Sequence, residues 1–194
     1  MRERQNILIA GGTSTGKTTL ANALLAEIAA TGDRVLVLED TIELQCTARD
    51  HVPLRTRAGV VSMTELVRAT MRLRPDRVIV GEVRGGEALD LIKVWGTGHP
   101  GGIATIHAGS ALGALLRLEQ LILEVAVNPP RALVAEAVNV VIHIAGRGRR
   151  RRIESIARVV GFDGVGYRLA DALEAPLPEL PLSSSSLNPS GELP

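Results

Sequence analysis

Short apolar runs alternate along the chain with stretches in which apolar positions recur every three or four residues. The apolar runs predict strands at residues 6–10, 34–39, 77–80, 102–106 and 138–145. The amphipathic stretches predict helices at residues 17–30, 64–73, 87–95, 111–125 and 131–137. Strands that are apolar throughout and alternate with helices are typical of a parallel sheet covered by helices, so the pattern predicts the α/β class.

The pattern changes after the last of these strands. Residues 153–160 alternate apolar and polar positions, and Tyr167-Arg168-Leu169 follows a glycine-containing turn, which predicts an antiparallel hairpin. Beyond about residue 175 the chain is rich in Pro and Ser, which is typical of disorder. We therefore expect one α/β domain at residues 1–172, with a mainly parallel sheet and a short antiparallel hairpin near its C-terminal end, and a disordered tail at residues 173–194.

Composition narrows the classes of function. The chain has 22 Lys and Arg against 21 Asp and Glu, so no overall field attracts nucleic acid, and aromatic residues make up only 2%. We expect no stable direct binding of nucleic acid. The single cysteine, Cys46, forbids an internal disulfide, and no apolar run approaches the ~20 residues that span a bilayer. These features favour a soluble, intracellular protein.

A phosphate-binding loop follows the first predicted strand. Residues 11–18 read G-x-x-x-x-G-K-T and lead into the first predicted helix, which is the context that this motif requires. In such a loop the backbone N–H groups surround phosphate oxygens, Lys17 reaches the β and γ phosphates, and the Thr18 hydroxyl ligates Mg²⁺. The sequence therefore predicts a nucleoside triphosphate site with Mg²⁺, bound by Gly11, Gly12, Thr13, Ser14, Thr15, Gly16, Lys17, Thr18 and Thr19.

Acidic residues follow two of the other predicted strands. The strand at residues 77–80 ends in Gly81-Glu82, so glycine stands where a metal-holding aspartate usually lies, and Glu82 is left to polarise the attacking water. Glu39, Asp40 and Glu43 follow the strand at residues 34–39, at the edge where ligands bind in an open α/β sheet. Glu39 and Asp40 suit Mg²⁺ directly or through water. Taken alone, either segment is also compatible with a solvated strand end.

Histidines and arginines leave more alternatives open. His107 ends the strand at residues 102–106, where an imidazole could sense the γ phosphate or simply end the strand, and His99 in the preceding glycine-rich loop favours the second role. The four histidines and one cysteine show no zinc-ligand spacing. Residues 147–152 (RGRRRR) could bind phosphate, nucleic acid or acidic lipid, but their place between two predicted strands favours a solvated turn.

Four segments together resemble the ATPase family that drives type II and type IV secretion, pilus dynamics and conjugal transfer. They are the phosphate loop at residues 9–19, the acidic segment at 37–44, the variant second nucleotide motif at 73–85 and the histidine segment at 98–108. The residues of these segments are most similar to those of the conjugal-transfer (TrbB-like) branch. The resemblance implies a RecA-like P-loop NTPase that hydrolyses ATP with Mg²⁺, forms a hexameric homo-oligomer at the cytoplasmic face of the inner membrane, and contacts proteins of a secretion or mating channel.

The resemblance also implies residue roles. Lys17 and Thr18 hold phosphates and Mg²⁺, Glu82 is the catalytic carboxylate, and His107 senses the γ phosphate. The acidic residues assist the metal and the water; they are Glu39, Asp40 and Glu43.

Members of this family carry an amino-terminal domain that supplies arginines to the nucleotide, and we expect this chain to be the carboxyl-terminal ATPase half. Loss of such arginines costs on the order of 10³-fold in phosphoryl transfer, so we expect ATP binding with slow hydrolysis. Arg84, and less directly Arg55 and Arg57, could supply charge within the chain.

Three other functions remain open from the sequence. A small-molecule kinase would also begin with a phosphate loop, although the glycine-rich histidine segment provides no arginine-bearing lid. A nucleotide-gated assembly module would bind ATP while a partner does the chemistry. A DNA-binding function rests on the arginine run alone.

Overall fold

A computed structural model describes residues 1–172, and within them eight strands form one sheet in the order β3-β2-β4-β5-β1-β6-β7-β8. Neighbouring strands from β3 to β6 run parallel, and β6, β7 and β8 pair antiparallel. Because β4, β5, β1 and β6 run parallel, their carboxyl ends lie at the same edge of the sheet. The strands are β1 (Ile7–Gly11), β2 (Val35–Glu39), β3 (His51–Arg55), β4 (Arg77–Val80), β5 (Ile103–Ile106), β6 (Val140–Ala145), β7 (Arg152–Phe162) and β8 (Tyr167–Asp171).

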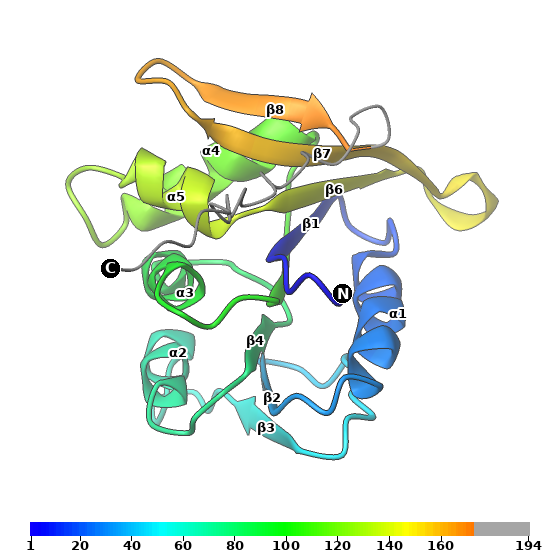
Figure 1. Cartoon of the computed structure of the whole chain (residues 1–194), viewed down its shortest axis with the longest axis vertical. Helices are drawn as coiled ribbons and strands as arrows, with labels where there is room; N and C mark the ends of the chain where they lie inside the picture. The colour runs from blue at the N-terminus through cyan, green and yellow to red at the C-terminus, as the bar shows by residue number, and fades with distance from the viewer. Residues whose placement is uncertain (173–194) are drawn as a thin grey trace, which may run out of the picture.

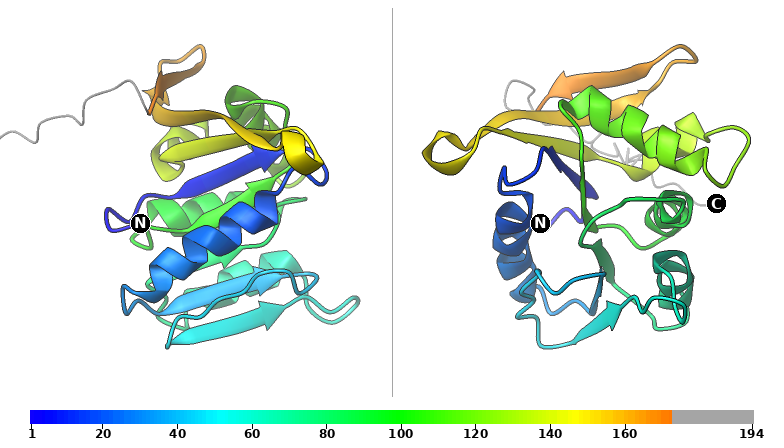
Figure 2. Two further views of the ribbon diagram at one scale, coloured as in Figure 1. Left: turned by 90° about the vertical axis from the view of Figure 1, so that its right-hand side faces the viewer. Right: turned by 180° about the vertical axis from the view of Figure 1, so that it is seen from behind.

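Helices cover both faces of the sheet unequally. Helix α1 lies on one face, and the other helices lie on the opposite face (Figures 1 and 2). Across residues 1–172 no helix is long and apolar enough to cross a membrane. The helices are α1 (Lys17–Ala29), α2 (Met63–Thr70), α3 (Glu87–Gly96), α4 (Ala111–Ile122) and α5 (Arg131–Ala137).

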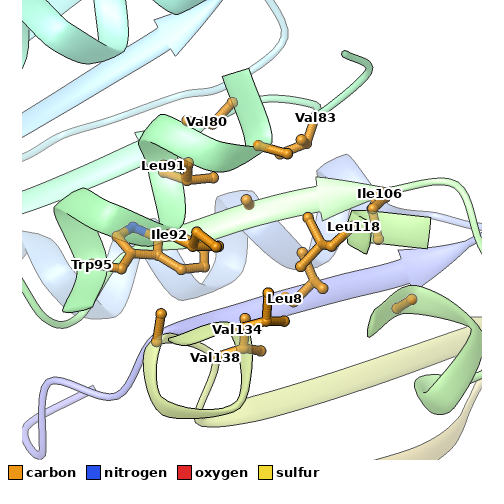
Figure 3. Close-up of a cluster of buried hydrophobic side chains, with 14 of the residues drawn as sticks. Leu8, Val80, Val83, Leu91, Ile92, Trp95, Ile106, Leu118, Val134 and Val138 are labelled. Atoms are coloured by element: carbon orange, nitrogen blue, oxygen red, sulfur yellow. The ribbon is translucent and has the colours of Figure 1, made fainter. Parts of the chain in front are cut away.

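Two apolar cores follow from the alternation of side chains along each strand. Ile7 and Ile9 of β1 face α1, whereas Leu8 and Ala10 pack into the larger core beneath α2 to α5. Figure 3 shows this larger core, with side chains of α3 and α4 meeting those of the sheet. Because both faces are covered, β1, β2, β4 and β5 are buried at every position and are mostly apolar, which agrees with the apolar runs of the sequence.

Close packing explains one glycine at the start of β5. A Cβ on Gly102 would overlap the indole of Trp95, whose Nε1 donates a hydrogen bond to the Val78 carbonyl at 3.2 Å. Glycine at this position therefore lets α3 lie directly against the sheet.

The structure confirms the predicted α/β class, the parallel sheet and the C-terminal hairpin, and it adds one strand. The apolar pattern does not predict β3, an edge strand in which Val52 and Leu54 are half-buried and the alternate residues are exposed. Pro53 interrupts the strand signal, and proline is tolerated there because an edge strand leaves N–H groups unpaired. The Pro/Ser-rich tail predicted at residues 173–194 lies outside the described residues.

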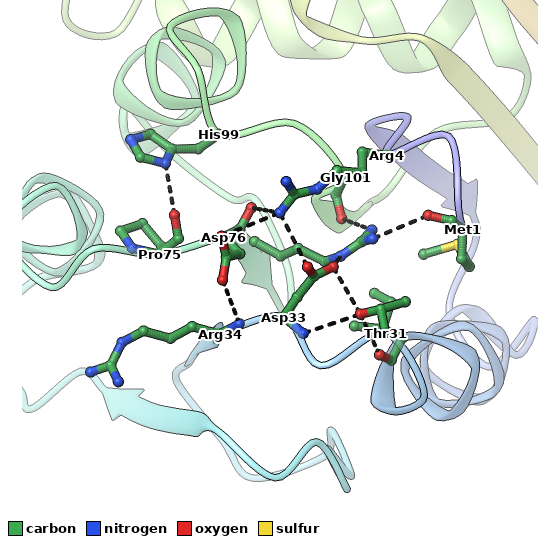
Figure 4. Close-up of polar contacts among 11 residues, drawn as sticks. Met1, Arg4, Thr31, Asp33, Arg34, Pro75, Asp76, His99 and Gly101 are labelled. Atoms are coloured by element: carbon green, nitrogen blue, oxygen red, sulfur yellow. Dashed lines mark hydrogen bonds and ion pairs between the residues drawn. The ribbon is translucent and has the colours of Figure 1, made fainter.

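A polar network closes the end of the sheet opposite to the phosphate loop (Figure 4). Arg77, at the start of β4, is 1% exposed; its Nε donates to Asp33 Oδ2 at 2.6 Å, and its other nitrogens donate to the Gly101 and Met1 carbonyls at 3.1 Å. Burial raises the pKa of Asp33, but hydrogen bonds from Arg77 and Thr31 outweigh it, so the pKa is lowered overall. The network thus ties the first residues of the chain to β4.

Replacement of Arg77 by methionine is expected to lower the free energy of unfolding by about 3 kcal/mol. The reason is that Asp33 stays charged but loses the ion pair and the hydrogen bond with Arg77. Urea unfolding at neutral pH measures this loss. Arg72→Met is the matched control: Arg72 is exposed, and we expect a change within about 0.5 kcal/mol. Equal unfolding midpoints for the two variants would contradict a stabilising role for the buried ion pair.

Candidate functional site

The phosphate-binding loop connects β1 to α1 at the carboxyl edge of the sheet. Gly16 has φ 102° and Ser14 has φ 62°, which turns successive backbone N–H groups inward. A Cβ on Gly11 would collide with the Thr15 side chain and the Ile144 carbonyl, so glycine is required for the loop to close against β6. Lys17 Nζ donates to the carbonyls of Gly11 and Gly12 at 3.0 and 3.1 Å, which extends the side chain across the loop.

A cavity of about 430 Å³ opens above this loop, which is enough volume for a small-molecule ligand. Its walls come from the carboxyl ends of β1, β2, β4 and β5 and from the turn after β6. Gly11 and Gly12 do not line this cavity, and their carbonyls accept the hydrogen bonds from Lys17. Lining residues are Thr13, Ser14, Thr15, Gly16, Lys17, Thr18, Thr19, Glu39, Asp40, Thr41, Glu43, Leu44, Gly81, Glu82, Arg84, Thr105, His107 and Arg151.

The acidic segment after β2 folds back toward the loop. Glu39 is 5% exposed, and its Oε1 accepts hydrogen bonds from the backbone N–H groups of Glu43 and Leu44 at 2.9 and 2.7 Å. These bonds place Glu43 Oε2 2.9 Å from the Thr18 hydroxyl, which donates to it. Asp40 accepts a hydrogen bond from the Thr56 hydroxyl at 2.7 Å. The segment therefore brings the Glu43 carboxylate to Thr18, the residue expected to ligate Mg²⁺.

Gly81 stands at the end of β4, where related nucleotide sites usually have an aspartate, and the neighbouring Glu39 explains why a side chain is not accommodated there. A Cβ on Gly81 would lie 3.2 Å from Glu39 Cγ, tighter than ordinary packing. Glu39 thus fills the space in front of Gly81, and its Oε1 lies 3.7 Å from the point that a Cβ on Gly81 would occupy.

Glu82, His107, Arg84 and Lys17 converge beside the loop. Glu82 Oε1 lies 2.7 Å from His107 Nε2, and His107 Nε2 lies 3.5 Å from Lys17 Nζ. Arg84 Nε donates to Glu82 Oε2 at 2.9 Å. One carboxylate is therefore held between an arginine and a histidine within reach of the loop lysine.

The charges of this cluster influence one another. Burial lowers the pKa of Lys17; the Arg84 charge lowers it further, while the Glu82 and Glu43 charges oppose both. The hydrogen bond to Glu82 and the charge of that carboxylate raise the pKa of Arg84. The site is thus a compact set of interacting positive and negative charges around the phosphate loop.

Three residues considered from the sequence lie elsewhere. His99 is at the opposite end of the sheet, where its Nδ1 lies 2.9 Å from the Pro75 carbonyl oxygen. Arg55 ends β3, and Arg57 lines a separate cavity beside α2, so neither lines the site. In contrast, Arg151 lines it, although the arginine run favours a solvated turn in the sequence. The only sequence signal for Arg151 is its place in the turn after β6, the strand next to β1.

A family model for the Type II/IV secretion system proteins matches residues 1–151. The chain belongs to this family. The conjugal transfer protein TrbB of Rhizobium radiobacter is 50% identical to it over 167 residues, covering 85% of this chain and 51% of that protein. The type IV secretion system protein PtlH of Bordetella pertussis is 41% identical over 166 residues, covering 77% and 49%. The chain therefore spans about half the length of these relatives.

Solved structures agree with this family assignment. The crystal structure of the VirB11 ATPase from the Brucella suis type IV secretion system, in complex with sulphate, matches with a TM-score of 0.73 and 33% identity over 81% of this chain and 50% of that chain. The pilus retraction motor PilT with bound ADP shares the fold, with a TM-score of 0.60 and 23% identity over 86% and 46%. The predicted fold class and family are confirmed.

Proposed function

We propose that this chain is the ATP-binding and ATP-hydrolysing part of a motor that powers type IV secretion or conjugal DNA transfer. The observation that supports it most directly is the convergence of Lys17, Thr18, Glu82 and His107 on one cavity above the phosphate loop. Membership in the secretion family adds the context and argues against the small-molecule kinase. Because the chain spans about half of its relatives, the coupling to transport is part of the proposal.

Each side chain has a role that its position permits. Lys17 and the loop N–H groups bind the phosphates, and Glu82 accepts a proton from the attacking water. His107, which contacts Glu82 and lies near Lys17, detects the γ phosphate and changes its contacts when that phosphate leaves. Arg84 supplies positive charge beside Glu82 while negative charge develops on the transferred group.

Thr18, Glu39 and Asp40 suit a magnesium ion that arrives with the nucleotide. Within residues 1–172 no group of three or more His, Cys, Asp or Glu side chains is arranged to hold a metal by itself. Mg²⁺ keeps several waters and takes few protein oxygens alongside phosphates, so one hydroxyl with carboxylates nearby, as at Thr18, fits it. Thr18 would ligate it directly, and Glu39 and Asp40 would bind its waters. When bound, Mg²⁺ neutralises charge on the phosphates.

The proposal includes assembly. We infer a homo-oligomeric, hexameric ring at the cytoplasmic face of the inner membrane, in contact with the channel proteins of a secretion or mating system. TrbB is a conjugal transfer protein, and PtlH and VirB11 belong to type IV secretion systems, which supports the contact with channel proteins.

Steady-state ATP hydrolysis by the purified 194-residue chain with Mg²⁺, measured across protein concentration, tests the enzymatic part. We expect Mg²⁺-dependent ATP binding and a specific activity that rises with protein concentration, because subunits in contact complete each other's sites. A chain that binds no ATP would contradict the proposal.

A second function is supported by the contacts that the Glu82 carboxylate makes with Arg84 and His107. The carboxylate accepts hydrogen bonds from Arg84 and contacts His107, so it is already paired on both oxygens. These observations favour a nucleotide-gated assembly module with little hydrolysis of its own. ATP binding without turnover at any protein concentration, with turnover restored by a full-length relative, would distinguish this function from a self-sufficient enzyme.

A further inference from the structure

Arg151 reaches the phosphate loop from the side opposite to the catalytic cluster. It follows the short 3₁₀ turn Gly148–Arg150, which connects β6 to β7. β6 pairs with β1, and Ile144 is in register with Gly11, so this turn lies at the same edge of the sheet as the phosphate loop (Figure 2). Arg151 lines the cavity, and its Cδ lies 3.6 Å from the point that a Cβ on Gly16 would occupy.

The backbone of the turn directs this side chain. Gly146 has φ 82°, and a Cβ there would overlap the Arg150 carbonyl, so glycine allows the turn to fold tightly. Arg152 then pairs with Glu154 along β7 at 2.7 Å. Arg151, one residue earlier, is directed to the cavity instead. The two neighbouring arginines therefore have different surroundings despite the uniform charge of the run.

The order of the strands in the sheet indicates which end of the cavity faces the γ phosphate and which faces the α phosphate. Glu82 follows β4 and His107 follows β5, and both strands lie on one side of β1; the turn that carries Arg151 lies on the other side. His107 Nε2 is 3.5 Å from Lys17 Nζ, so the γ phosphate of a bound nucleotide belongs at the β4 and β5 end. The α phosphate and the nucleoside then extend toward β6.

We propose that Arg151 binds the α-phosphate end of the nucleotide and so contributes to the affinity for diphosphate and triphosphate alike. This inference rests on the proposed function, because it takes the cavity to be a nucleotide site. A guanidinium presents planar, charged donors that match phosphate oxygens. The arginine run is thus not a uniform solvated turn: one of its members belongs to the site.

Binding of ADP and of a non-hydrolysable ATP analogue to the 194-residue chain, measured by calorimetry with Mg²⁺, tests the inference. Arg151→Ala is expected to weaken both ligands by about 10-fold, the loss of one charge-assisted contact, and Arg151→Lys to restore part of the affinity. Arg149→Ala is the matched control, since Arg149 carries the same charge in the same turn but does not line the cavity. We expect a change below about twofold for it.

Three outcomes would overturn the inference: unchanged affinity in Arg151→Ala, a loss confined to the triphosphate, or an equal loss in Arg149→Ala. The second outcome would place Arg151 at the γ phosphate, and the third would reduce its effect to the general field of the turn. If the unsubstituted chain binds neither nucleotide, the proposed function itself fails, and this result is distinct from all three.

Discussion

Glu82→Gln is expected to lower the rate of ATP hydrolysis by about 100-fold to 1,000-fold while leaving nucleotide affinity unchanged or slightly higher. Glutamine keeps the size of the side chain and can still accept the hydrogen bond from Arg84. It cannot take a proton from water, and general-base catalysis contributes roughly 10² to 10⁴ in rate. It also removes a negative charge from beside the phosphates, which does not weaken their binding.

Single-turnover hydrolysis with enzyme in excess over ATP measures this effect even when steady-state turnover is slow. Glu136→Gln is the control, because Glu136 is exposed on α5 and does not line the cavity. A Glu82→Gln chain that hydrolyses ATP at the unsubstituted rate would exclude Glu82 as the base. The remaining carboxylates that line the cavity, those of Glu39, Asp40 and Glu43, would then need the same test.

Residues adjacent in the sequence made the phosphate loop predictable. The motif is continuous, and its strand and helix are signalled by apolar periodicity on both sides, so the loop needs no long-range information. Glu82 and His107 were predictable for a related reason: each follows a buried strand, and parallel strands end at the same edge of the sheet.

Contacts between distant segments were not predictable. The close approach of the Glu39 side chain to Gly81 depends on the pairing of β2 with β4, which places the end of β2 beside the end of β4. Arg151 could be separated from the other arginines only once β6 was placed beside β1 and the turn at Gly146 was known. In the same way, β3 could not be predicted from the apolar pattern, because its five residues include Pro53 and only alternate side chains are partly buried.

Lys17→Ala is expected to weaken the binding of both ADP and ATP by about 100-fold, which is the loss of roughly two charge-assisted hydrogen bonds to phosphate oxygens. Lys17 is 8% exposed and is held across the loop by the carbonyls of Gly11 and Gly12, so its position is set before a ligand arrives. Preorganisation of this kind means that little side-chain entropy is lost on binding. The affinity loss should therefore approach the full value of the contacts.

Calorimetric titration with Mg²⁺ and either nucleotide measures the loss, and thermal unfolding without nucleotide shows whether the variant is folded. Lys93→Ala provides the matched control, because Lys93 is the other lysine of the chain and is exposed on α3, away from the cavity. Nucleotide should raise the unfolding temperature of the unsubstituted and Lys93→Ala chains and leave that of Lys17→Ala almost unchanged, since only a bound ligand stabilises the folded state. An equal rise in all three would mean that the phosphates bind somewhere other than the loop between β1 and α1.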